Sequence, residues 1–157
     1  MVKRTSFQGD DCPIARSLEA LGDWWSLLII RDAFLGVSRF GEFQKKLGLA
    51  KNILAVRLRT LVDQDILATA PASDGSAYQE YRLTPKGRGV FPILVALRQW
   101  SEEYDEHPEE IATLLVDREK GKPVHKLALY SEDGRLLEDR DTTLKPRRAK
   151  HWRPLSV

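Results

Sequence analysis

Hydrophobic residues recur three and four positions apart through the first 64 residues of the chain, which is the spacing of one helical face. This pattern predicts four helices, at 13–21, 24–35, 39–47 and about 51–64, and a glycine follows each of the first three. The second helix has so few polar positions that we expect it to be buried nearly all round. The last two are joined by a turn of about three residues, as in a helix-turn-helix motif.

The periodicity changes after Asp65. Alternating apolar and polar residues predict strands at 66–70 and 78–84 around the polar turn 73–76, which together make a β-hairpin. A long amphipathic helix is expected from about residue 89 to residue 104. Because the hairpin follows a helix-turn-helix, the order of elements predicts a winged helix.

The last third of the chain has few apolar residues of its own. We expect a short helix at 109–116 and a second hairpin formed by 123–130 and 136–141. The predicted fold class is therefore mainly α with a small β-wing (α+β): a winged helix-turn-helix with dimerisation helices, plus a C-terminal β-hairpin extension.

The net charge is only +2, but the charges are unevenly distributed. Residues 39–59 hold six basic residues and one acid, whereas residues 100–110 hold six acids and no lysine or arginine. A second basic stretch runs from Lys145 to Arg153. Such segregation indicates that particular faces of the molecule meet a polyanion.

Composition excludes several other classes. One cysteine and three scattered histidines cannot form a Cys/His zinc site, so we expect no metal. The sequence has no glycine-rich phosphate loop, paired histidines or Ser/His/Asp set, so we expect no cofactor and no enzyme. The longest apolar run, around 27–30, is far shorter than the roughly 20 residues that cross a bilayer. With no secretory signal at the N-terminus either, we expect a cytoplasmic protein that does not bind membranes.

An ordered set of short motifs resembles the HxlR-type winged-helix transcriptional regulators, which are relatives of the MarR class. The motifs are Cys12-Pro13-Ile14, the run Gly22–Asp32, Arg39-Phe40-Gly41-Glu42-Phe43, Arg57-Leu58-Arg59-Thr60-Leu61, the run Tyr81–Gly87, and Trp100. The resemblance implies a homodimeric DNA-binding regulator without catalytic activity. We therefore predict a DNA-binding and dimerisation domain at 12–108 and an extension with a hairpin and basic tail at 109–157.

The helix at 51–64 is then the recognition helix, which would enter the major groove of double-stranded DNA. The residues expected on its outward face are Lys51, Asn52, Ala55 and Arg59. The cations expected to contact phosphates from the preceding helix are Arg39, Lys45 and Lys46. Arg57 points away from the outward face, so it either contacts DNA or pairs with a carboxylate. A solvated basic face is the alternative for the whole set, and a protein-protein module without DNA specificity is the alternative function.

The wing tip carries Asp74 and no lysine or arginine, although wings of this family usually bear a cation. Ser76 and Gln79 are expected to act as neutral donors to DNA, with Arg82 as the nearest cation. Aromatic residues around the second and third helices are expected to be core, although a cavity between the second and last helices could hold a small-molecule effector. The aromatic residues are Trp24, Trp25, Phe34, Phe40 and Phe43.

The first and last helices carry more apolar surface than one small domain can bury, so we predict that they form a homodimer interface. Its residues are Ile14, Leu18, Phe91, Leu94, Leu97, Trp100 and Tyr104. Two recognition helices about 34 Å apart would then call for an inverted-repeat operator. Cys12 has two interpretations: the resemblance implies a sensor of oxidants or electrophiles at a helix N-terminus, whereas the alternative is a small buried packing residue.

Overall fold

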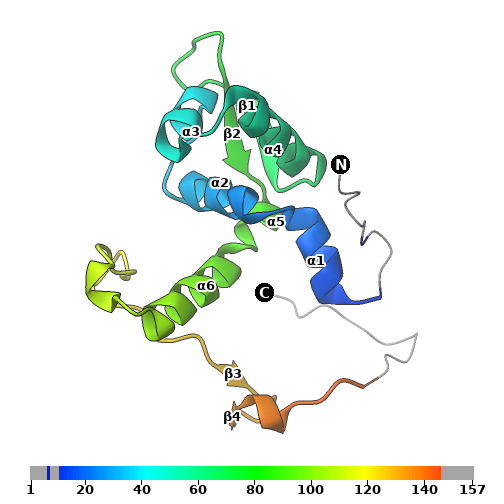
Figure 1. The fold of residues 1–157 in the computed structure, drawn as a ribbon, viewed down its shortest axis with the longest axis vertical. Coiled ribbons are helices and arrows are strands. Elements are labelled where there is room, and N and C mark those ends of the chain that lie inside the picture. Colours follow the sequence, from blue (N-terminus) through cyan, green and yellow to red (C-terminus); the bar gives the residue numbers. More distant parts are fainter. Residues whose placement is uncertain (1–6, 8–10, 146–157) are drawn as a thin grey trace. The chain divides into compact units, whose positions relative to one another are not determined.

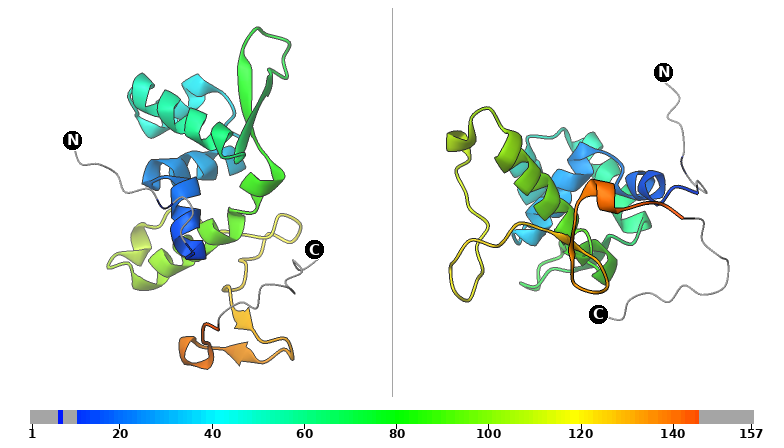
Figure 2. Two further views of the ribbon diagram at one scale, coloured as in Figure 1. Left: turned by 90° about the vertical axis from the view of Figure 1, so that its right-hand side faces the viewer. Right: turned by 90° about the horizontal axis from the view of Figure 1, so that it is seen from below.

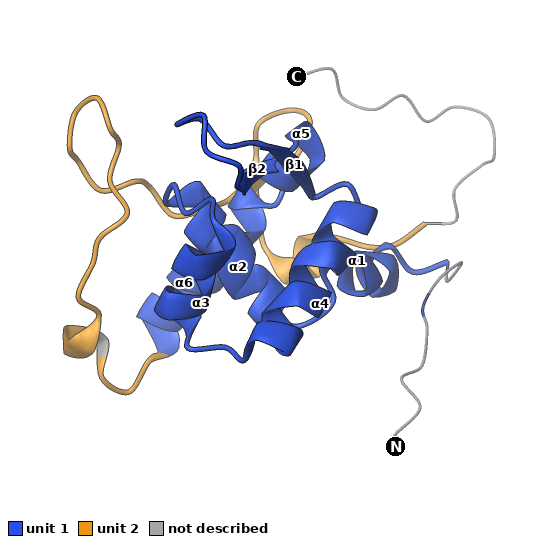
Figure 3. Ribbon diagram, turned by 90° about the horizontal axis from the view of Figure 1, so that it is seen from above, with its two compact units in different colours: residues 1–104 blue, residues 105–157 orange. Residues whose placement is uncertain are grey.

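A computed structural model gives the structure of residue 7 and residues 11–145. The chain divides into two compact units, 1–104 and 105–157 (Figure 3). In the described part of the chain, no helix is long and apolar enough to cross a membrane.

The first unit contains six helices and one hairpin within its described residues (Figure 1). In chain order they are α1 (Pro13–Leu21), α2 (Trp24–Phe34), α3 (Phe40–Leu47), α4 (Lys51–Asp63), β1 (Leu67–Pro71), β2 (Gln79–Leu83), α5 (Pro85–Arg88) and α6 (Phe91–Tyr104). This order confirms the predicted winged helix. The helix α5 was not predicted, and it moves the start of the long helix from residue 89 to Phe91. The Thr84 hydroxyl accepts the Gly87 N–H at 3.0 Å, which fixes this extra turn.

Carboxylates hold the first turns of two helices. The Asp23 side chain accepts the Ser26 N–H at 3.1 Å at the start of α2. The Glu42 side chain accepts the N–H groups of Ser38 and Arg39 at 3.1 and 3.0 Å at the start of α3. These bonds satisfy donors that a helix N-terminus leaves without intrahelical partners. The helix α3 ends at Gly48, which has a left-handed φ of 65°.

The core of the first unit forms where α2 meets α3, α4 and the base of the wing. Its fully or almost fully buried apolar residues are Ile29, Ile30, Phe43, Leu54, Leu58, Leu61, Ile66 and Leu67. The expectation that α2 is buried nearly all round is wrong at its start, because Trp24 is 72% exposed. Of the aromatic residues predicted as core, Phe43 is buried, and Trp25, Phe34 and Phe40 pack partly buried against the core.

The strands β1 and β2 pair antiparallel from Leu67 opposite Leu83 to Pro71 opposite Gln79. The hairpin projects past α3 and α4 (Figure 2, left). The backbone before α3 joins it, because the Ser38 carbonyl accepts the Tyr81 N–H at 2.7 Å. Inside the unit, the rings of Phe43 and Tyr81 meet edge to face at 6.4 Å. The wing is therefore attached to the helix-turn-helix through both backbone and side chains.

The second unit has little regular structure in its described residues. Its elements are the 3-10 helices η1 (Pro108–Glu110) and η2 (Asp139–Asp141) and the strands β3 (Leu129–Tyr130) and β4 (Leu136–Leu137). The predicted hairpin is present, but each strand has only two residues. The predicted helix at 109–116 is wrong, since only the single turn η1 forms. No residue from 105 to 145 whose side chain is described is buried, so no core supports longer elements. The boundary between units falls after Tyr104, and the functional division at 108 stays a prediction. The basic tail lies outside the described residues beyond Lys145.

Candidate nucleic-acid interface

The helix α4 presents a mixed polar and apolar face to solvent. Lys51, Asn52 and Arg59 are exposed and Ala55 is half-buried, while Leu54, Leu58 and Leu61 on the other face are fully buried. Val56 lies between Asn52 and Arg59 on the same face and is 52% exposed. The sequence analysis missed Val56, because a valine at helical spacing is normally assigned to the core. This face offers a cation, an amide and an apolar surface together.

Arg57 lies on the side of α4 and forms an ion pair with Asp23. Its guanidinium is 2.5 Å from the Asp23 carboxylate, and the two side chains are only 26% and 22% exposed. The alternative in which Arg57 pairs with a carboxylate is therefore correct, while its contact with DNA stays a prediction. Since Asp23 also caps the N-terminus of α2, the ion pair holds α4 to the junction of α1 and α2.

Lys46 on α3 is also in an ion pair. Its ammonium lies 3.2 Å from Oδ1 of Asp32, which is completely buried and also 3.0 Å from the guanidinium of Arg31. The phosphate contact of Lys46 stays a prediction. Its ion pair with Asp32 also connects α3 to α2. Lys45 is exposed on the same helix.

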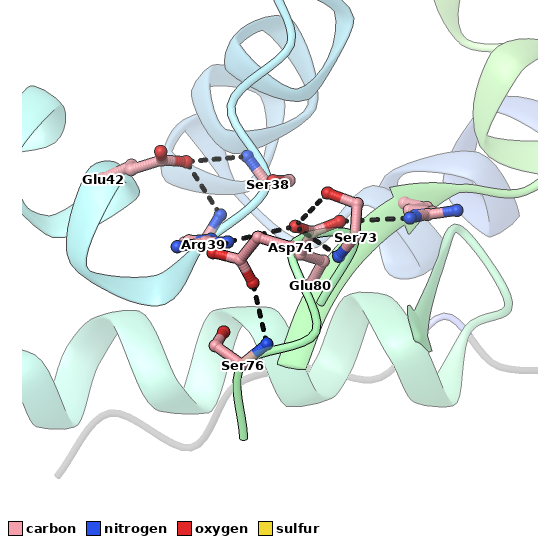
Figure 4. Close-up of polar contacts among 8 residues, drawn as sticks. Ser38, Arg39, Glu42, Ser73, Asp74, Ser76 and Glu80 are labelled. Carbon is pink, nitrogen blue, oxygen red and sulfur yellow. Dashed lines mark hydrogen bonds and ion pairs between the residues drawn. The ribbon is translucent and has the colours of Figure 1, made fainter. Parts of the chain in front are cut away.

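Arg39 connects the start of α3 to the wing (Figure 4). Its guanidinium is 2.5 Å from Oδ2 of Asp74 and 3.5 Å from Oε1 of Glu80. The hydrogen bond and the charge of Asp74 raise the pKa of Arg39 above its usual value. The hydrogen bond from Arg39, followed by those from Ser76, holds the pKa of Asp74 well below its ordinary range. Both groups therefore stay ionised at neutral pH.

Glu80 forms the base of the same cluster and is almost completely buried. It accepts hydrogen bonds from the N–H and hydroxyl of Ser73 at 3.1 and 2.9 Å and from Arg82 at 3.1 Å (Figure 4). The bonds from Ser73 and then Arg82 lower the pKa of Glu80 below its usual value. The sequence analysis missed Glu80, because a glutamate that alternates with Tyr81 and Leu83 along a strand is normally assigned to the solvent-exposed face. Arg82, predicted as the nearest wing cation, is half-exposed and held by Glu80.

The wing tip contributes the remaining predicted contacts. Gln79 is exposed, whereas Ser76 is half-buried and its N–H donates to Asp74 at 3.0 Å. A groove of about 670 Å³ separates the wing from the start of α3. Its lining residues include Arg39 and Lys45 from α3 and Tyr78, Gln79 and Tyr81 from the wing.

Most of the predicted dimer residues are exposed on α1 and α6. The exposed residues are Ile14, Leu18, Phe91, Leu97, Trp100 and Tyr104. Leu94 is partly buried against the core of its own unit. Phe91 is exposed but also contacts its own unit, because its ring centre lies 5.1 Å from that of Phe34. The interface itself stays a prediction.

Cys12 caps the N-terminus of α1, and its carbonyl accepts the Arg16 N–H at 3.1 Å. Its side chain is exposed in the single chain, so it is not buried within one subunit, and its role as a sensor or as a packing residue at a dimer interface stays a prediction. Among the described residues, no group of histidine, cysteine, aspartate and glutamate side chains could hold a metal ion.

The arrangement of α1 to α4, the solvent-facing side of α4 and the hairpin attached to α3 define a winged helix-turn-helix transcription regulator. A model of the HxlR-like helix-turn-helix family matches residues 20–109, so the chain belongs to that family. This confirms the resemblance drawn from the sequence motifs.

Similar proteins include regulators that share the second unit. The HTH-type transcriptional regulator Rv3095 of Mycobacterium tuberculosis is 36% identical over 140 residues, covering 89% of this chain and 87% of that protein. The crystal structure of PA1607, assigned as a transcription factor, is 53% identical with a TM-score of 0.85, covering 91% of this chain and all of that one. The redox regulator HypR in its reduced form is 25% identical with a TM-score of 0.55, covering 62% of this chain and 98% of that one.

Proposed function

We propose that this protein is a homodimer that binds an inverted-repeat operator in double-stranded DNA through α4. The observation that carries the proposal is the solvent-facing side of α4, where Asn52, Val56 and Arg59 lie in line on the helix that follows the cation-bearing α3. Amide and guanidinium groups can read base edges, and a small apolar group can contact a thymine methyl. We also propose that the protein acts in the cytoplasm, where it would meet this DNA. An apolar outward face on α4 would instead favour a protein-protein module, and Lys51, Asn52 and Arg59 argue against it.

Selection from a random duplex pool, followed by titration of the preferred site, tests DNA recognition. We expect Asn52→Ala and Arg59→Ala each to weaken that site by about 1 to 3 kcal/mol while random duplexes change little. Lys45→Ala should weaken all duplexes alike and reduce the salt slope by about 0.9. Arg88→Ala, which removes an exposed cation on α5, is the matched control. If neither class of variant changed binding, α4 would not be the recognition helix.

The dimer is supported by the exposed apolar side chains of α1 and α6. Leu97→Asp should produce a folded monomer in light scattering at micromolar concentration and weaken operator binding, because a single half-site remains. Leu35→Asp is the control, since Leu35 is also an exposed leucine but lies at the end of α2. A wild-type monomer would remove the proposal of an inverted repeat.

Cys12 is proposed as the trigger, since an exposed thiol at the head of an interface helix can report oxidants or electrophiles. As the chain has one cysteine, a disulfide would join two subunits or capture a small thiol. Operator affinity should fall after diamide or quinone treatment in the wild type and stay constant in Cys12→Ser. Equal affinities in all four states would instead point to a small-molecule effector.

A further inference from the structure

The wing tip carries an acidic group at the position where DNA-binding wings commonly carry a cation. That group, Asp74, is paired with Arg39, the first cation of the basic segment. The two residues are 35 positions apart, so the pair exists only because the hairpin folds back over the start of α3.

We propose that Asp74 is a latch that occupies Arg39 in the free protein and that a DNA phosphate replaces its carboxylate on binding. The inference rests on the proposed function and adds a means of restraining it. An aspartate carboxylate and a phosphate both accept hydrogen bonds from the same guanidinium fork, so one can substitute for the other.

Accessibility favours this exchange. The Arg39 and Asp74 side chains are 33% and 50% exposed, and an ion pair between such groups contributes little stability. The groove beside the pair opens between α3 and the wing and is also lined by Lys45. A phosphate entering this groove would meet two cations, and the one carboxylate of the lining, that of Glu42, already accepts two backbone N–H groups.

The surrounding contacts hold Arg39 in place if Asp74 leaves. Its N–H donates to Glu42, which fixes the backbone at the start of α3, and Glu80 lies 3.5 Å from its guanidinium. Glu42 is occupied by the N–H groups of Ser38 and Arg39. Since the pKa of Asp74 is strongly lowered, protonation near neutral pH does not open the pair. Replacement by another anion is the route that remains.

The test is a double-mutant cycle on affinity for a random-sequence duplex at low salt, with Asp74→Asn, Arg39→Gln and the double variant. Asparagine keeps an oxygen that can accept the Ser76 N–H, while it removes the charge and replaces the Oδ2 acceptor of Arg39 with an amide NH2 group. We expect Asp74→Asn to tighten binding about two- to fivefold, which matches the strength of an exposed ion pair. In the Arg39→Gln background the same change should have no effect.

The control is Asp133→Asn, which removes an exposed carboxylate from the Ser-Glu-Asp-Gly turn of the second unit. A gain from Asp74→Asn that persists with Arg39→Gln, or that Asp133→Asn reproduces, would indicate general charge repulsion and overturn the latch alone. Absence of duplex binding by the wild type and by Asp74→Asn would overturn the proposed function and the latch together. Thermal melting of each variant verifies folding, and Asp74→Ser is a second variant that removes the same charge.

Discussion

The ion pair between Arg57 and Asp23 ties the recognition helix to the start of α2, and breaking it should change both stability and DNA recognition. Arg57→Gln removes the cation, and Asp23→Asn removes the anion while keeping a side-chain oxygen that can cap α2. The two changes therefore isolate the pair from the cap.

The magnitude follows from distance and burial. The charged atoms are 2.5 Å apart and about three quarters of each side chain is covered. Exposed pairs contribute about 0.2 to 1 kcal/mol, whereas removing one partner of a fully buried pair costs about 3 to 5 kcal/mol. This intermediate case should lose about 1 to 2 kcal/mol per single change, with a coupling energy of about 1 kcal/mol.

Urea unfolding of the wild type, both single variants and the double variant at one fixed protein concentration measures that coupling. DNA titrations over a range of salt concentrations then separate the two roles of Arg57. If Arg57 is a positioning residue, Arg57→Gln should change the affinity for the preferred site relative to random duplexes and leave the salt slope unchanged. Asp23→Asn should have the same effect. A coupling energy near zero would refute the structural role. A salt slope lowered by about 0.9 in Arg57→Gln alone would indicate a phosphate contact.

Three other predictions test separate parts of the first unit. Gly87→Ala should lower the melting temperature sharply, because a Cβ there would lie 2.1 Å from a backbone carbonyl oxygen. A Cβ at Gly41 meets nothing within 4 Å, so Gly41→Ala should stabilise α3 by up to about 1 kcal/mol. The folded-state pKa values of Asp74 and Glu80 lie below their ordinary values of 3.8 and 4.5. Their contribution to stability is therefore complete above about pH 4.5 and is lost as the pH falls further. Lowering the pH below about 4.5 should accordingly reduce the melting temperature of Asp74→Asn less than that of the wild type. Replacing a contacted thymine by deoxyuridine in the preferred site should weaken binding by the wild type about fourfold but change binding by Val56→Ala less; equal losses would show that Val56 does not contact the methyl group.

Local patterns predicted the helices and the wing well, because each depends on neighbours within a few residues. The buried positions Leu54, Leu58 and Leu61 recur at helical spacing, and the face opposite them was predicted correctly for Asn52 and Arg59. The misplaced elements lie where no such pattern exists. The second unit lacks a core among its described residues, so periodicity there carried no information on helix length.

Partners that are distant in sequence were beyond prediction. Arg39 and Lys46 read as two equivalent cations of one helix, yet one is held by the wing and the other by a buried carboxylate of α2. These pairings depend on how the hairpin and α2 approach α3 in three dimensions. Charge counts identified a basic segment but not which of its cations pair with carboxylates.

The hydrogen bond from the Tyr81 N–H to the Ser38 carbonyl joins two main-chain groups at the base of the wing. Side-chain substitution cannot remove it, except by placing proline at position 81. Mutations that adapt the wing tip or the α4 surface to a new DNA sequence can therefore accumulate while this hydrogen bond keeps the hairpin beside α3. Members of the family could thus diverge on these two surfaces while the arrangement of the wing beside the helix-turn-helix stays the same.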